Sequence, residues 1–164
     1  PEELLKEAKT LDGDFESELS KTKELRLITK RAVTTHNSWT HNTDRMLKGS
    51  DGTNYLYMNP RDAQKLRLNP GDLADVSTIH ARIRIPVKFL PELKTGTVAI
   101  PHGWGHQDSG LSIAGKTRGV NVNLLAGSGT GQIDPLSGMS KLTALQVSIS
   151  PSEGEQAMSW SGIA

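Results

Sequence analysis

Short runs in which apolar and polar residues alternate recur along most of this 164-residue chain, and turn-forming residues separate them. Alternation of this kind is typical of β-strands, because successive side chains of a strand point to opposite faces of a sheet. Seven runs have this character: 25–29, 55–58, 73–78, 83–87, 97–100, 120–125 and 142–149. Seven short strands predict a mainly β fold with short helices, built as a barrel or a sandwich.

One helix is predicted among these strands, over residues 60–68. Asn59 suits the N-cap, Pro60 suits the first helical position, and Asp62 favours the positive end of the helix dipole. A capped helix that leads into a hairpin is structural in most proteins, so this segment by itself indicates nothing about function. Two of its apolar residues should face the core: Ala63 and Leu66.

The two ends of the chain lack the alternating pattern of its middle. Residues 1–24 are predicted to form a helix or a linker, in which apolar residues at helical spacing end at Leu11 and residues 12–14 stop the first helix. Residues 25–150 form the one domain that this length predicts. Residues 151–164 are polar and small, which predicts a flexible tail.

Composition excludes several classes of function. With 19 basic and 18 acidic residues the net charge is +1, so no general field would hold a nucleic acid or an anionic membrane. Cysteine is absent, which excludes disulfides, thiolate zinc sites and cysteine-ligated iron–sulfur clusters. No apolar run approaches the roughly 20 residues that span a bilayer, so we expect a soluble, cytoplasmic protein without membrane insertion. The absence of an initiating Met suggests a processed product or a fragment of a longer chain.

A cluster of polar residues follows the first predicted strand. Arginine makes forked hydrogen bonds to phosphate oxygens, and asparagine or serine pairs with the polar edges of a heterocycle without adding charge. The same composition also suits a solvated loop with a cap or two, and spacing alone does not decide between these readings. The cluster comprises Thr29, Arg31, His36, Asn37, Ser38, His41 and Asn42.

A second cluster, Pro-His-Gly-Trp-Gly-His, occupies residues 101–106. Glycines let backbone N–H groups approach a ligand closely, and Gly103 lies in what should be a tight, irregular turn. Trp104 either packs on a flat ring of a ligand or fills the core. The histidines of both clusters lack compact metal-ligand spacing and any supporting cysteine, so no metal site is predicted at His36, His41, His102 and His106.

The third cluster lies in the run 120–125. In a strand, Asn121 and Asn123 would share one face, which requires partners for both amides. Alternatively, the two side chains close backbone turns. Further on, Asp134 introduces a turn that ends in Ser-Gly, and the glycines at 127–131 lack the Gly-Lys-Ser/Thr ending of a phosphate-binding P-loop.

Taken in chain order, the three clusters and the 56–63 segment resemble the C-terminal molybdopterin dinucleotide-binding domain of molybdopterin oxidoreductases, the dimethyl sulfoxide reductase and formate dehydrogenase family. The resemblance covers about 25–151 and implies a double-psi β-barrel. It also implies that the loop side chains approach the cofactor. One departure is the turn 78–81, which lacks the usual glycine and should be longer or differently shaped, with His80 exposed at its tip.

The resemblance implies a cofactor-positioning role, with no turnover by this chain alone. The cofactor would be molybdopterin guanine dinucleotide carrying molybdenum or tungsten, with the metal ligated outside this chain. The partner would be the catalytic domain or subunit of a molybdopterin oxidoreductase, for which formate oxidation is one family activity. The residues implied in cofactor binding are Thr29, Arg31, His36, Asn37, His41, His102, Gly103, Trp104, Asn121, Asn123 and Asp134.

Two alternatives have different signatures. The same barrel serves as a protein-interaction module without cofactor in chaperone-like ATPases, but such a module needs no polar clusters on one side. A small self-contained enzyme would need a nucleophile at a turn, for which Ser128 is the candidate, and no local signature arranges it for hydrolysis.

Overall fold

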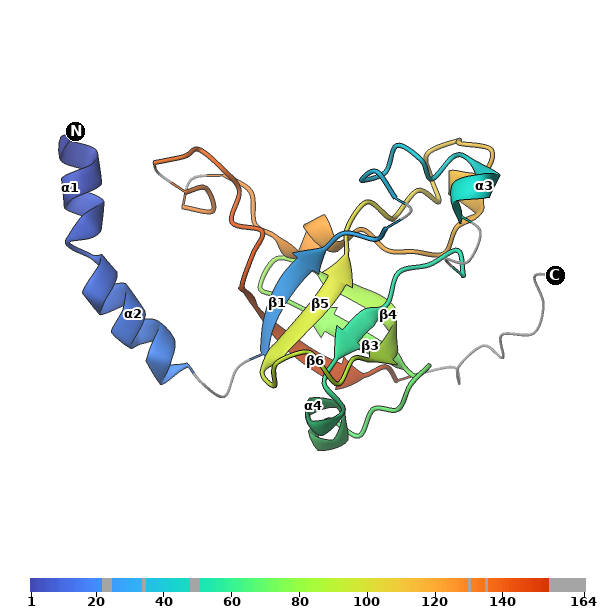
Figure 1. The fold of residues 1–164 in the computed structure, drawn as a ribbon, viewed down its shortest axis with the longest axis horizontal. Helices are drawn as coiled ribbons and strands as arrows, with labels where there is room; N and C mark the ends of the chain where they lie inside the picture. Colours follow the sequence, from blue (N-terminus) through green and yellow to red (C-terminus); the bar gives the residue numbers. More distant parts are fainter. Residues whose placement is uncertain (22–24, 34, 48–50, 130, 135, 154–164) are drawn as a thin grey trace.

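Six strands close into a barrel in the order β1-β5-β2-β4-β3-β6 (Figure 1). The structure is a computed structural model that describes residues 1–21, 25–33, 35–47, 51–129, 131–134 and 136–153. The prediction of a mainly β barrel with short helices is confirmed. The strands are β1 Leu25–Lys30, β2 Leu56–Met58, β3 Leu73–Ser77, β4 Arg82–Phe89, β5 Thr97–Pro101 and β6 Leu145–Pro151.

The pairing of the strands decides which loops meet. β1 is parallel to β5, with Lys30 opposite Pro101, so both strands end at the same rim of the barrel. β2 runs antiparallel to β5, so the segment before β2 reaches this rim too. We call this end, with residues 31–33, 35–47, 51–55 and 102–126, the loop rim. The loops at the upper right of Figure 1 belong to it.

The barrel interior holds the hydrophobic core. Along β4, the side chains of Ile83, Ile85 and Val87 are buried, whereas Arg82, Arg84 and Lys88 between them are exposed or partly exposed. This is the period-two pattern that predicted the strand. Full burial of each such aliphatic side chain stabilises the fold by about 1.5–3 kcal/mol. The other strands contribute Leu27, Leu56, Met58, Ala74, Val76, Val98, Ile100, Val147 and Ile149.

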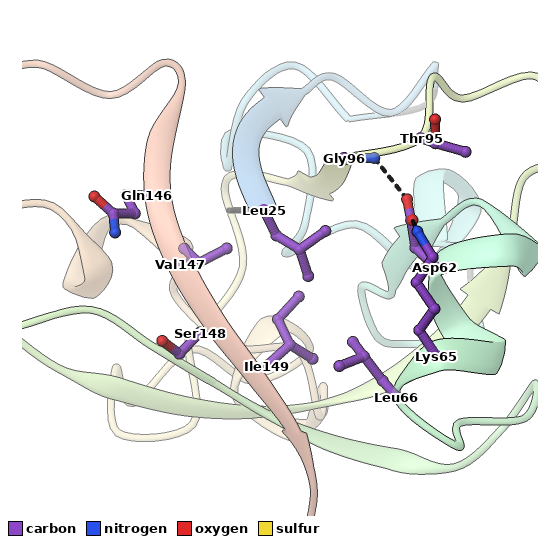
Figure 2. A pocket seen from close by; sticks show the side chains of 10 residues that line it. All are labelled: Leu25, Asp62, Lys65, Leu66, Thr95, Gly96, Gln146, Val147, Ser148 and Ile149. Atoms are coloured by element: carbon purple, nitrogen blue, oxygen red, sulfur yellow. Dashed lines mark hydrogen bonds and ion pairs between the residues drawn. The ribbon is translucent and has the colours of Figure 1, made fainter. Parts of the chain in front are cut away.

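The predicted helix is present as α4, Pro60–Lys65, and it braces the end of the barrel opposite the loop rim. Asn59 is its N-cap, and the amide of this residue donates to the carbonyls of Pro91 and Leu93 at 3.1 and 2.8 Å. Asp62 accepts from the backbone N–H of Gly96 at 2.6 Å. Figure 2 shows this bond beside a cavity of about 720 Å³ between α4, β1 and β6.

Helix α4 is shorter than the predicted 60–68. It ends early because Arg67 adopts a left-handed φ of 58°, and the N–H of Leu68 bonds back to the carbonyl of Ala63 at 3.0 Å. This is the pattern of a Schellman closure, which satisfies the last carbonyls of a helix. The predicted core contacts hold: Ala63 is fully buried, and Leu66 packs partly buried against the core.

The run 120–125 is not a strand, so that prediction is wrong. It contains the 3-10 helix η2, Val122–Leu125, because the Asn121 side chain accepts from the N–H of Asn123 at 3.0 Å and caps a helical turn. Val122 and Leu125 are buried, whereas Asn123 and Leu124 are exposed. Apolar residues three apart on one side are the pattern of a turn of helix, which the alternation Asn-Val-Asn-Leu obscured.

Two helices precede the barrel and project away from it (Figure 1). These are α1, Glu2–Ala8, and α2, Leu11–Ser20, so residues 12–14 lie inside a second helix instead of ending the first one. Glu18 of α2 forms an ion pair with Arg26 of β1 at 2.6 Å. No helix among the described residues is long and apolar enough to cross a membrane.

Two remaining expectations concern connecting segments. The turn 78–81 closes with the N–H of Thr78 bonded to the carbonyl of Ala81 at 2.9 Å, and none of its residues has a positive φ, so it needs no glycine. His80 is exposed there, as predicted. β6 extends to Pro151, and residues 154–164 of the expected tail lie outside the described residues.

Candidate functional site

Asn54 holds the segments of the loop rim together by hydrogen bonds. Its side chain is 1% exposed, and its amide N–H groups donate to the carbonyls of Pro101 and Val120 at 2.9 and 3.0 Å. Its carbonyl oxygen accepts from the N–H of Val120 at 2.9 Å. One side chain therefore holds both ends of the segment 102–119. No sequence signal revealed this role, because Gly-Thr-Asn before a strand equally suits an exposed turn.

The loop after β1 and the turn after β5 meet at this rim. The imidazole Nε2 of His102 lies 2.9 Å from the amide oxygen of Asn37. Gly103 has a φ of +89°, and a Cβ placed on it would lie 2.5 Å from the backbone oxygen of Asn37. The first and second polar clusters therefore adjoin in space. The close approach requires glycine at position 103.

A buried group of rings lies beneath this contact. His41 is fully buried, and its ring centroid lies 4.4 Å from that of Trp104, which is 4% exposed. The Nε2 atom of His106 lies 2.7 Å from the carbonyl oxygen of Gly103 and 3.1 Å from Nδ1 of His41. Trp104 fills the core of the rim instead of exposing its ring to solvent.

The carbonyl of Gly103 fixes the tautomer of His106. A carbonyl oxygen only accepts, so Nε2 of His106 carries a proton and donates it to this oxygen. Nε2 of His41 and Nε1 of Trp104 are buried and have no hydrogen-bond partner among the described residues. Two adjacent buried ring nitrogens without partners are unusual, because each unpaired polar group costs about 1–3 kcal/mol.

Burial lowers the pKa of His41 below its ordinary 6.5, and the charge of nearby His106 lowers it further, against the opposing effect of the Gly103 carbonyl. A histidine with a lowered pKa binds fewer protons in the folded than in the unfolded state below that value. The stability that neutral His41 contributes is therefore present above pH 6.5 and is lost as the pH falls. His106 is the titratable group that adjoins His41 in the described chain.

We expect the urea midpoint of the barrel to fall between about pH 7.5 and about pH 5.5, a window above the titration of ordinary carboxylates. His41→Phe should flatten this dependence, because the buried titratable ring is gone. His80→Phe, at an exposed position, is the matched control and should keep the parent slope. An unchanged slope in His41→Phe would show that another group carries the dependence.

Several predicted residues organise the rim or stay exposed on it. Asn42 accepts from the N–H groups of Ile113 and Ala114 at 2.9 and 3.1 Å and so caps the 3-10 helix η1, Ala114–Lys116. Asn121 closes the turn of η2, which is the alternative left open for it. Thr29 is half-buried in β1 opposite Ile100. Four predicted residues are exposed there: Arg31, His36, Asn37 and Asn123.

Asp134 does not join the other clusters. Its loop, 131–141, projects on the other side of the barrel, at the upper left of Figure 1. The carboxylate accepts from the N–H and the hydroxyl of Ser137 at 2.7 and 2.8 Å and from the N–H of Leu136 at 3.2 Å. The bonds from Ser137 hold the pKa of Asp134 below its usual value. Asp134 therefore closes its own turn.

The described residues contain no group of three or more His, Cys, Asp or Glu side chains that could hold a metal ion. What the rim presents is a set of hydrogen-bonding groups: an amide paired with an imidazole, an arginine and two buried ring nitrogens without partners. Such a set suits a polar, anionic ligand with flat edges more than it suits a metal ion.

Comparisons with known proteins agree with this geometry. A family model described as Molydopterin dinucleotide binding domain matches residues 25–145. The arsenate respiratory reductase molybdopterin-containing subunit ArrA of Chrysiogenes arsenatis is 27% identical over 105 residues, covering 58% of this chain and 12% of that protein. Acetylene hydratase from Pelobacter acetylenicus has a similar fold, with a TM-score of 0.66 and 24% identity over 83% of this chain and 19% of that chain. This chain therefore corresponds to a small part of each of these two proteins.

Proposed function

The chain belongs to the molybdopterin dinucleotide-binding domain family, and we propose that its loop rim holds the pterin dinucleotide of a larger molybdoenzyme. The observation that carries the proposal is the meeting of the loops after β1 and β5, which the parallel pairing of these strands makes possible. The match covers 12% of the arsenate reductase subunit, so we also propose that this chain acts together with a catalytic partner. It would be another domain or subunit of the same enzyme.

The residues present fit such a cofactor. The buried nitrogens Nε2 of His41 and Nε1 of Trp104 have no hydrogen-bond partner among the described residues, and a polar group of a ligand or a bridging water would satisfy them. Asn37 and His102 offer an amide and an imidazole, which suit the alternating donors and acceptors along a pterin edge. Arg31, exposed directly after β1, suits a phosphate oxygen.

When bound, the pterin dinucleotide carries the metal at which the chemistry of this family takes place. The chain's own residues would position it. Asn37 and His102 orient the heterocycle, Arg31 neutralises phosphate charge, and Trp104 keeps water out of the rim beneath the ligand. The turn at Gly103 sets the distance between the two loops. We assign no proton transfer or turnover to this chain alone.

The finer identity of the cofactor and the reaction are separate proposals. We propose the guanine form of the dinucleotide, with molybdenum or tungsten, on the family resemblance. Formate oxidation by the whole enzyme has the same support, whereas the similar proteins are an arsenate respiratory reductase subunit and an acetylene hydratase. Assays of the whole enzyme with formate, arsenate and acetylene would separate these reactions.

The double-psi topology is likewise proposed. Its support is the symmetry of strand pairing about the antiparallel pair β5–β2. On one side, β5 is parallel to β1, which is antiparallel to β6; on the other side, β2 is parallel to β4, which is antiparallel to β3. Antiparallel pairing of β3 with β6 closes the barrel. The alternative function, a protein-interaction module without cofactor, would give no role to the polar rim and its two unpaired ring nitrogens. Purification of the whole protein with a stable partner and no pterin would favour that alternative.

We expect Arg31→Ala to weaken cofactor retention in the assembled enzyme about tenfold, because a charged hydrogen bond contributes about 1.5–3 kcal/mol. Asn123→Ala should weaken it less, since its amide is neutral. The measurement is the guanine nucleotide and metal that remain per protein after dialysis, with circular dichroism to verify folding. Arg61→Ala, exposed on α4 at the other end of the barrel, is the control. Unchanged cofactor content in both rim variants would refute these residue roles.

A further inference from the structure

A groove opens on the loop rim, and of its lining residues the family resemblance singled out Trp104 alone. It has a volume of about 260 Å³ and lies between the segment 32–33 after β1 and the segment 51–55 before β2. Tyr57 of β2, Lys88 of β4, Pro101 of β5 and Trp104 complete its lining. Trp104 belongs to the turn after β5, so the groove is continuous with the proposed cofactor site.

Two lysines stand over tyrosine rings at this groove. The ammonium nitrogen of Lys30 lies 4.2 Å from the ring centroid of Tyr57, and that of Lys88 lies 5.1 Å from the ring centroid of Tyr55. A ring face holds a cation in place without neutralising its charge. Because the ammonium groups are already held, an anion that binds them costs less side-chain entropy.

The one carboxylate in the lining, Asp51, is already engaged. It accepts from the hydroxyl of Tyr55 at 3.0 Å. Burial, with this bond and the charge of Asp51, raises the pKa of Tyr55 to about 12, so the phenol stays neutral and keeps donating at neutral pH. Two cations therefore lie at the groove with one carboxylate: Lys88 and Asp51 line it, and Lys30 lies over the ring of Tyr57, which also lines it.

We propose that Lys30 and Lys88 hold a phosphate group of the pterin dinucleotide in this groove, while the turn at Trp104 holds the heterocycle; this rests on the proposed function. The groove is smaller than the about 300–1,000 Å³ typical of sites that enclose a whole ligand. It suits a phosphorylated part of the cofactor. The larger cavity beside α4 does not compete, because it lies at the opposite end and its Asp62 already binds Gly96 and Lys65.

The test is a calorimetric titration of the 164-residue chain with inorganic pyrophosphate. The double variant Lys30→Gln, Lys88→Gln should bind at least about tenfold more weakly, with a shallower dependence on salt, since two charged contacts are lost. Lys94→Gln, an exposed lysine at the opposite end of the barrel, is the charge-matched control and should bind as the parent does. Three results would each overturn the subsite: no saturable binding by the parent, parent-like binding by the double variant, or an equal loss in Lys94→Gln.

A second arm separates the dinucleotide from free phosphate. The cofactor-loaded enzyme should not bind pyrophosphate in the groove, because the cofactor's own phosphate occupies it. Binding that persists in the loaded enzyme would overturn the assignment to the dinucleotide. The two proposals fail on different results. Unaffected cofactor retention in Arg31→Ala and Asn123→Ala counts against the proposed function. Parent-like pyrophosphate binding by the double lysine variant counts against the subsite alone.

Discussion

Asn54→Ala should lower the free energy of unfolding by about 3 kcal/mol, since one buried and two partly buried hydrogen bonds are lost and their backbone partners are left unpaired. The two carbonyls and one N–H left behind belong to Pro101 and Val120. A loss of this size should lower the melting temperature of a domain this long by about 10 °C. The measurement is urea unfolding followed by circular dichroism.

The same substitution should loosen the loop rim more than the barrel. Asn54 fixes both ends of the segment 102–119, so amide hydrogens in that segment should exchange faster while those of the barrel strands stay protected. Asn69→Ala is the control, because Asn69 is exposed and bonds within its own turn. Two results would contradict this role of Asn54. One is amide exchange that accelerates uniformly across the whole barrel; the other is a loss of unfolding free energy no larger than that of Asn69→Ala.

Gly103→Ala should destabilise the rim by about 3 kcal/mol or more, from backbone strain and overpacking together. A Cβ at this position would lie 2.5 Å from the oxygen and 2.7 Å from the carbon of the Asn37 carbonyl, and φ is +89°. Both contacts are with backbone, so no side-chain rotation relieves them. The variant should also separate His102 from Asn37, which the NMR chemical shifts of the His102 ring nitrogens would detect.

Gly110→Ala isolates the steric part of this effect. Gly110 follows in the same loop with a φ of +70°, yet a Cβ on it would meet nothing within 4 Å. It should therefore cost only the backbone penalty, about 1–2 kcal/mol. Equal losses in the two alanine variants would mean that the contact between the loops after β1 and β5 contributes little to the stability of the rim.

Much of the local structure was predictable because it depends on neighbours in the chain. Asn59 and Pro60 specified the start of α4, and alternation specified β4. The prediction over 120–125 was wrong because the Asn121 side chain bonds two residues ahead and favours a helical turn over extension. The helix end was misplaced because Arg67 adopts positive φ without being glycine.

The candidate site was predictable in part. Polar clusters pointed to the loops after β1 and β5, and the structure brings Asn37, His102 and Gly103 together there. Asp134 matched the family pattern yet stands in a separate loop, closing a turn with Ser137. The sequence did not reveal the roles of the lysine pair and of Asn54, because their partners lie on other strands or loops. Lys30 and Tyr57 are 27 residues apart in the chain, and Asn54 and Val120 are 66 residues apart.

The sequence by itself determined six of the seven predicted strands, the cap of α4 and the polar character of the loops, since these follow from propensities and contacts over a few residues. Only the tertiary structure decided that the loops after β1 and β5 share one rim, because that depends on the parallel register of Lys30 with Pro101, two residues far apart in the chain. It also decided that His41 and Trp104 are buried with ring nitrogens that have no hydrogen-bond partner among the described residues. Burial and unmet hydrogen bonds arise from closure of the barrel and its loops, which no local pattern encodes.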